Sequence, residues 1–146
     1  STSDASNLEA SYAQSRGTGF NSENKRRIMI GTYVLSSGYY DAYYKKAAKL
    51  RTKLINEFMD AYKTVDFLIG PTAPSTAPKI GENSDDPLKM YLLDIMTVPV
   101  NLVGVPAISI PCGSSDGMPV GLQIIGQSRM DKELLEFAKQ CEGALK

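Results

Sequence analysis

The sequence contains no histidine among its 146 residues. A Ser-His-Asp or Cys-His catalytic site therefore cannot be assembled from this chain alone, because both need an imidazole as general base. The absence also removes the imidazole ligand that zinc sites commonly use. If the chain takes part in cleaving an amide, the general base is of another chemical type or lies outside these residues. We also predict no metal site.

Cysteine, net charge and long apolar segments are scarce as well. The two cysteines, Cys112 and Cys141, are too few for a disulfide framework and indicate reduced thiols. Sixteen basic residues balance sixteen acidic ones, so no overall field draws the chain toward nucleic acid or an anionic membrane. No apolar run reaches the roughly 18 residues of a membrane span, and the polar segment Ser1–Ser11 lacks the apolar core of a signal peptide. We therefore expect a cytoplasmic protein.

Two helices are predicted in the N-terminal half, the first from a capping residue and the second from its apolar spacing. Residues 1–20 mix Ser, Gly and Asn with little periodicity, and we interpret them as loop or as the edge of a fragment. A first helix is expected from Ser22, which can cap its first turn, to about Leu35. A second helix is expected over Tyr39–Tyr62 and would need a sheet or other helices to cover its apolar stripe. That stripe comprises Tyr43, Ala47, Leu50, Leu54, Phe58 and Ala61.

Three short segments predict strands. Val65–Gly70 (VDFLIG) has consecutive apolar residues, which is typical of a strand covered on both faces. Ala107–Pro111 and Val120–Ile125 are two further strands. The turn dipeptide Asp116-Gly117 between them predicts a hairpin.

Two aspartates mark the starts of further helices. Asp86, followed by Pro87, is expected to cap a helix that reaches about Met96. Asp131 is expected to cap a last helix from Lys132 to about Cys141. The order helix, strand, helix, strand, strand, helix predicts an α/β fold, with a mixed sheet flanked by helices.

Four segments resemble the amidase-signature family. They are KRRIMIGTYVLSSGYYDAYYKK (Lys25–Lys46), VDFLIGPTAP (Val65–Pro74), DPLKMYLLDIMTVPVNLVGVPAISIPCG (Asp86–Gly113) and PVGLQIIG (Pro119–Gly126). The last three have relatives throughout the family. The first resembles, within it, the glutamine-hydrolysing subunits of the tRNA-dependent amidotransferases. The resemblance runs from about Glu9 over nearly the whole chain.

The resemblance implies a fold, an activity and partners. Residues 1–146 would form the C-terminal segment of an amidase-signature domain, without its N-terminal catalytic part. The activity implied is hydrolysis of glutamine, which supplies ammonia for the ATP-dependent conversion of glutamyl-tRNA(Gln) to glutaminyl-tRNA(Gln), a carbon–nitrogen ligase reaction. The implied partners are subunits B and C, glutamine and, through the complex, the tRNA. ATP and Mg²⁺ are expected in the complete complex and no cofactor in this chain. No membrane is implied, and the isolated fragment is expected to self-associate.

The resemblance also implies where the catalytic residues should be found. The family's nucleophile is a serine, activated through a second serine in a cis peptide by a lysine, and all three lie in a segment rich in glycine and serine. Ser36-Ser37-Gly38 lacks the flanking glycines, and Ser114-Ser115 lies in an expected turn. We therefore assign no catalytic residue to this chain and expect the isolated chain to be inactive.

By resemblance, two residues bind the substrate. Arg27 matches the arginine that holds the α-carboxylate of glutamine, and Asp94 matches the aspartate that holds its α-ammonium. The chemistry suits both roles, since arginine offers two parallel N–H donors to a carboxylate and aspartate accepts from an ammonium. Amides without the amino-acid end would leave these groups unpaired and be rejected.

The residues alone leave alternatives open. Arg27 lies in a basic triplet and can be simply solvated, and Asp94 lies in an apolar run where a structural salt bridge is common. Arg26 and Arg27 project about 100° apart on a helix, so only one of them is expected to face a pocket. At the level of the protein, the alternatives are a fragment of a stand-alone amidase for another small amide, or a non-catalytic structural or interaction module.

Overall fold

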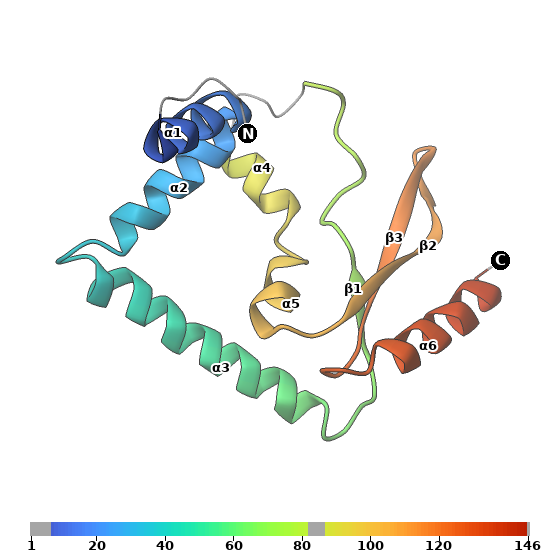
Figure 1. Cartoon of the computed structure of the whole chain (residues 1–146). Helices are drawn as coiled ribbons and strands as arrows, with labels where there is room; N and C mark the ends of the chain where they lie inside the picture. The colour runs from blue at the N-terminus through green and yellow to red at the C-terminus, as the bar shows by residue number, and fades with distance from the viewer. Residues whose placement is uncertain (1–6, 82–86, 146) are drawn as a thin grey trace. The chain divides into compact units, whose positions relative to one another are not determined.

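The computed structural model describes residues 7–81 and 87–145 (Figure 1). They belong to two compact units, Ser1–Lys49 and Leu50–Lys146, and the division falls inside one long helix, α3 (Lys46–Ala61). Among the described residues, no helix has both the length and the apolar character that crossing a membrane requires.

The first unit begins with a helix, α1 (Leu8–Gly19). The Oδ1 atom of Asn7 accepts a hydrogen bond from the backbone N–H of Ala10 at 2.8 Å and so caps the first turn. Glu9 adds an acidic group to that turn, which favours helix formation. The prediction of loop over residues 1–20 is therefore wrong for α1. Capping starts this helix although its sequence has almost no apolar periodicity.

The second helix, α2 (Ser22–Val34), covers nearly the predicted range. Its cap is Asn21 and not Ser22, because the Asn21 side chain accepts a hydrogen bond from the backbone N–H of Asn24 at 2.9 Å. The predicted cap is one residue late. Asparagine is as good a cap as serine, so the local chemistry does not separate two neighbouring candidates.

The long helix expected over Tyr39–Tyr62 is present in two parts. It opens with a short π-helix, η1 (Tyr40–Lys45), and continues as α3. Within the second unit, α3 is tied to other elements at two points. The Nε atom of Arg51 donates to the carbonyl of Leu102 at 2.6 Å, and the hydroxyl of Tyr62 donates to the carbonyl of Gly126 at 2.9 Å.

The second unit contains a three-stranded antiparallel sheet. Its strands are β1 (Leu68–Pro71), β2 (Ala107–Ser115) and β3 (Met118–Ile125), in the order β1-β3-β2. Asp116 and Gly117 join β2 to β3 with φ values of 52° and 77°. Two consecutive left-handed residues match the twist of a two-residue hairpin loop. The hairpin prediction and the α/β fold class with helices beside a sheet are confirmed, and the described strands pair antiparallel only.

The prediction that the first strand is covered on both faces is wrong for the described residues. In β1 half-buried and exposed residues alternate, and Ile69 is 65% exposed. The alternation shows that, among the described residues, only one face of this strand is covered. Phe67, directly before β1, instead packs against the core.

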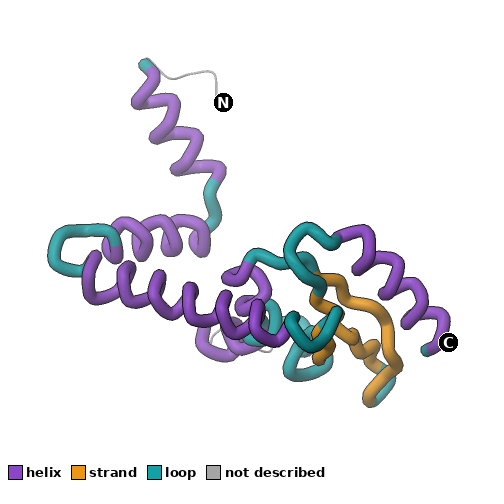
Figure 2. Tube along the Cα trace, turned by 90° about the horizontal axis from the view of Figure 1, so that it is seen from below, coloured by secondary structure: helices purple, strands orange, loops and turns teal. Residues whose placement is uncertain are grey.

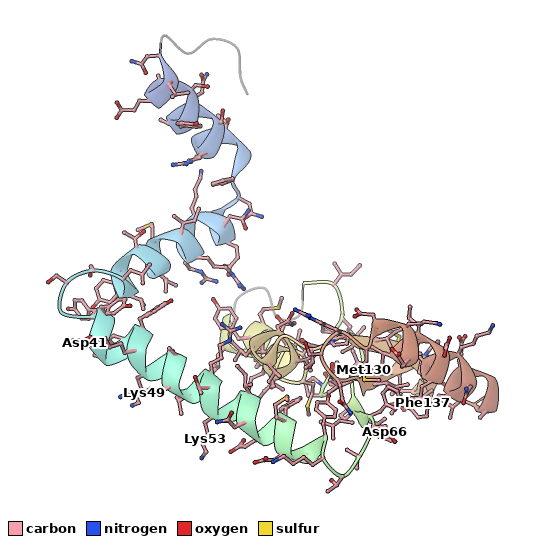
Figure 3. All side chains as sticks on the ribbon, turned by 60° about the horizontal axis from the view of Figure 1, so that its bottom comes forward. Asp41, Lys49, Lys53, Asp66, Met130 and Phe137 are labelled. Atoms are coloured by element: carbon pink, nitrogen blue, oxygen red, sulfur yellow. The ribbon has the colours of Figure 1, made fainter. Side chains whose placement is uncertain are left out.

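The last helix, α6 (Asp131–Ala144), covers one face of the sheet. Figure 2 shows α6 running alongside the strands, and Figure 3 shows Phe137 on the side of α6 nearest Asp66. The rings of Phe67 and Phe137 stack with centroids 4.4 Å apart. Asp131 is the first helical residue and not the cap, since the cap position is Met130 without a side-chain hydrogen bond. The buried core consists of Ile110, Ile124, Leu134 and Ala138.

Two short helices precede β2 and carry the candidate site. They are α4 (Pro87–Leu93) and α5 (Val98–Val103), separated by a turn over residues 94–97. The helix predicted to reach Met96 therefore ends three residues early. Pro99 lies in the first turn of α5, where proline is favoured, so the segment starts a new helix there and does not continue α4. The predicted cap, Asp86, lies outside the described residues.

Candidate functional site

Arg27 lies in the middle of α2, in the first unit, and its side chain is 65% exposed. Its Nε atom donates to Oε1 of Glu23 at 2.8 Å. Arg26 pairs with the other oxygen of the same carboxylate. Both arginines therefore converge on one acidic residue a turn earlier in the helix, and Arg27 is oriented by a charged partner.

The two arginines change the acidity of Glu23. The hydrogen bond from Arg27 is the largest influence that holds the pKa of the Glu23 carboxyl below its usual value, and the bond and charge of Arg26 act in the same direction. Glu23 therefore remains ionised at neutral pH. Glu23 holds Arg27 through its Nε atom, and the guanidinium group is the one that can offer parallel N–H donors to a carboxylate.

Asp94 lies in the second unit, at the start of the turn between α4 and α5. Its side chain is exposed, although its neighbours in sequence are apolar. Among the residues that the structure describes, its carboxylate forms no ion pair, so the structural salt bridge considered from the sequence is not found there.

The backbone of this turn is strongly hydrogen-bonded. The carbonyl of Asp94 accepts from the backbone N–H groups of Thr97 and Val98, each at 3.0 Å, and from the Thr97 hydroxyl at 3.1 Å. The carbonyl of Thr97 accepts from the Asn101 side chain at 2.9 Å. The turn that carries the Asp94 carboxylate is thus held in one conformation by its own neighbours.

The sheet adds a further bond that the sequence analysis did not anticipate. The side-chain amide of Gln123 donates from Nε2 to the carbonyl of Met96 at 3.1 Å. Gln123 is only 5% exposed and lies in β3, between apolar residues. The one signal for it in the sequence is a single polar residue inside the otherwise apolar run VGLQII.

A polar cavity of about 270 Å³ lies beside the turn in the second unit. Thr72 and Ser109 are hydrogen-bonded through their hydroxyls at 2.6 Å, and both also line a second cavity of about 540 Å³. Gly121 leaves room for them, because a Cβ atom there would lie 2.5 Å from the Ser109 hydroxyl oxygen. Hydroxyl and amide groups that can bind small polar ligands or water line the smaller cavity: Thr72, Thr97, Asn101, Ser109 and Gln123.

Neither serine segment considered as a nucleophile has an activating partner in the described residues. The hydroxyl of Ser36 donates to the carbonyl of Tyr33 at 2.6 Å, which places it at the end of α2 in a local turn. Ser114 and Ser115 lie at the end of β2, before the hairpin loop. Arg27 and Asp94 lie in different units, so their joint action on one ligand stays a prediction.

Comparison with known proteins places these residues in a family context. The family model described as Amidase matches residues 2–135. Among curated proteins, the A subunit of glutamyl-tRNA(Gln) amidotransferase from Geobacillus thermodenitrificans is 61% identical over 143 residues, which is 98% of this chain and 30% of that protein. The protein of the same name from Nostoc punctiforme is 54% identical, over 97% of this chain and 29% of that protein.

Two solved structures are similar as well. The A subunit of glutamyl-tRNA(Gln) amidotransferase from Thermotoga maritima has a TM-score of 0.66 at 46% identity, and the match covers 89% of this chain and 28% of that one. The structure of 6-aminohexanoate cyclic dimer hydrolase has a TM-score of 0.60 at 33% identity, covering 75% of this chain and 25% of that one. The chain therefore spans about 30% of the length of the curated relatives that it matches.

Proposed function

Because the chain belongs to the amidase family, we propose that it is part of the glutaminase subunit of a glutamyl-tRNA(Gln) amidotransferase. The observation that supports this most is the 61% identity, over 98% of the chain, to the A subunit of such an enzyme. The 6-aminohexanoate cyclic dimer hydrolase is similar at a lower level, 33% identity over 75% of the chain. Identity of this extent favours the amidotransferase subunit over an amidase for another substrate.

In this proposal the chain holds the amino-acid end of glutamine. Arg27 binds the α-carboxylate, and Asp94 binds the α-ammonium. Two observations support the assignment: the Arg27 guanidinium is exposed and oriented by Glu23, and the Asp94 carboxylate is exposed on a well-bonded turn. Gripping a zwitterion from both sides of its α-carbon fixes the direction in which the side-chain amide extends. The amide then meets the reacting groups in one orientation, which lowers the entropic part of the barrier.

In this proposal the groups that cleave the amide lie outside this chain. Ser36 lies in a local turn at the end of α2, and Ser114 and Ser115 lie at the end of β2. In this proposal the chain therefore supplies substrate binding and not the nucleophile. Ammonia released from glutamine would be used by the complete complex with subunits B and C, in the cytoplasm, as a carbon–nitrogen ligase. ATP and Mg²⁺ would act in that complex, and we assign them no site in this chain.

The test compares substrates in the complete glutaminase subunit that carries this segment, assembled with subunits B and C. We expect it to hydrolyse glutamine and, with ATP and Mg²⁺, to convert glutamyl-tRNA(Gln) to glutaminyl-tRNA(Gln). We also expect glutamine to be preferred over simple amides that lack the α-carboxylate and α-ammonium. Faster turnover of simple amides than of glutamine, with no glutaminyl-tRNA formed, would instead identify an amidase for another substrate.

A further inference from the structure

Gln123 is a buried polar side chain in the central strand of the sheet. In the register of β3 it lies opposite Gly70 on one side and Ser109 on the other. Among the residues described in the structure, Gln123 is the one polar residue that is buried, with 5% of its surface exposed. A buried amide without a hydrogen-bond partner is costly, so such a residue is expected to have a specific partner.

The partner of Gln123 is far away in the sequence and belongs to the candidate site. Its Nε2 atom donates to the carbonyl of Met96, 27 residues earlier, at 3.1 Å. A carbonyl only accepts, so the amide nitrogen and not the amide oxygen must face Met96. Met96 lies two residues after Asp94 in the same turn. The bond therefore connects the sheet to the turn that carries the proposed ligand of the α-ammonium.

The other bonds of the turn are local. Those accepted by the carbonyl of Asp94 come from Thr97 and Val98, and the carbonyl of Thr97 accepts from Asn101, so they shape the turn but connect it only to itself and to the start of α5. The Gln123 bond connects the turn directly to the sheet. Because the Asp94 carboxylate is exposed and has no ion pair among the described residues, its position is determined through its backbone.

We propose that Gln123 is a positioning residue: its side-chain amide holds the turn of Asp94 against the sheet, so that the carboxylate is in place for the α-ammonium of glutamine. This inference rests on the proposed function. When a residue that supports a binding group loses its hydrogen bond, the binding group is still present but is held too loosely. Loss of Gln123 should therefore weaken the preference for substrates with an α-ammonium and have little effect on other amides.

The experiment uses two substrates in the complete glutaminase subunit, assembled with its partner subunits. Glutaramate keeps the carboxylate and the amide of glutamine and has hydrogen in place of the α-ammonium. The measured quantity is the ratio of kcat/KM for glutamine to kcat/KM for glutaramate. Gln123→Met keeps the size of the side chain and removes the donor, and we expect the ratio to fall about fivefold, as for the loss of one hydrogen bond. Gln140→Met, the same change at an exposed position of α6, is the matched control and should leave the ratio unchanged.

Asp94→Asn in the same assay separates this inference from the proposed function. If Asp94→Asn leaves the ratio unchanged, Asp94 is not the ligand of the α-ammonium and the proposed function fails in that part. If Asp94→Asn lowers the ratio while Gln123→Met lowers both kcat/KM values equally, Gln123 is only structural and the positioning role is overturned. The double variant should show no further loss of ratio beyond Asp94→Asn, because both changes remove one interaction.

Gln123 is buried, so the Gln123→Met variant can fail to fold. A second variant then tests whether the hydrogen bonds of the turn position Asp94. Thr97→Val removes the hydroxyl that donates to the carbonyl of Asp94 at 3.1 Å and leaves the sheet intact. We expect it to lower the ratio about twofold, as for a weaker neutral hydrogen bond. An unchanged ratio in Thr97→Val, together with a lowered ratio in Asp94→Asn, would show that the bonds of the turn do not position the carboxylate.

Discussion

Arg26 and Arg27 offer a matched pair for testing the proposed carboxylate ligand. They are adjacent in α2, both are exposed, and both pair with Glu23. Replacing either one by alanine removes one exposed ion pair with the same partner. The melting temperature should therefore change by a similarly small amount in both variants, because exposed ion pairs contribute little to stability.

The kinetic effects of the two changes should differ strongly. A hydrogen bond to a charged group contributes about 1.5–3 kcal/mol, so loss of the carboxylate contact in Arg27→Ala should raise KM for glutamine about 10- to 150-fold. The value of kcat should change much less, since the contact is made in both the ground state and the transition state. Arg26→Ala should leave KM within about twofold of the parent, because the proposal gives Arg26 no contact with glutamine.

Steady-state glutaminase assays on the complete subunit measure both constants. Arg27→Lys adds a further test, because lysine keeps the charge and loses the paired donors, and it should restore KM only in part. Equal KM values for Arg27→Ala and Arg26→Ala would refute the assignment of Arg27. A large increase for Arg26→Ala alone would mean that the neighbouring arginine binds the carboxylate.

Three further predictions follow from the described contacts. Asp94→Asn should raise KM for glutamine, and in combination with Arg27→Ala the two losses should be less than additive if both groups hold one ligand, which a double-mutant cycle measures; full additivity would argue for separate sites. Gly121→Ala should destabilise the protein by about 1–3 kcal/mol in urea unfolding, because the new Cβ atom would lie 2.5 Å from the Ser109 hydroxyl and 2.9 Å from that of Thr72. Addition of Ser109→Ala should recover part of that loss, and no recovery would assign the cost to another contact. The isolated 146-residue chain should show no glutaminase activity and should self-associate in sedimentation velocity, since apolar side chains are exposed along α2; turnover by this chain would contradict the assignment of the nucleophile to other residues.

Elements with strong local signals could be predicted from the sequence. The hairpin follows from Asp116-Gly117, because few residues other than glycine, asparagine and aspartate adopt two consecutive left-handed conformations. Most of the helix over Tyr39–Tyr62 follows from apolar spacing, and the start of α2 follows from a predicted cap one residue away from the observed one. In each case the determining contacts lie within a few residues along the chain.

Other features depend on contacts between distant segments and could not be predicted in this way. The run VDFLIG predicts a strand covered on both faces, but whether a second element covers the other face depends on segments far away in the sequence, and among the described residues only one face of β1 is covered. The segment around Asp94 is divided between α4 and α5, although its apolar spacing alone continues one helix. The helix α1 is not predicted although its cap, Asn7, is a local signal, because the helix has little apolar spacing.

At the candidate site, family resemblance and the contacts in the structure give different residues. Arg27 and Asp94 are identified by resemblance, since a basic triplet and a single acidic residue do not distinguish a ligand from a solvated charge. The role inferred for Gln123 could not come from either source, because its partner is the backbone carbonyl of Met96, which leaves no trace in the choice of side chain. A strand that places an amide among apolar residues indicates that a partner exists, and the structure identifies it. The position of Asp94 is then a property of the sheet as much as of the turn, so changes at Gln123 should alter substrate preference without touching any group that contacts glutamine.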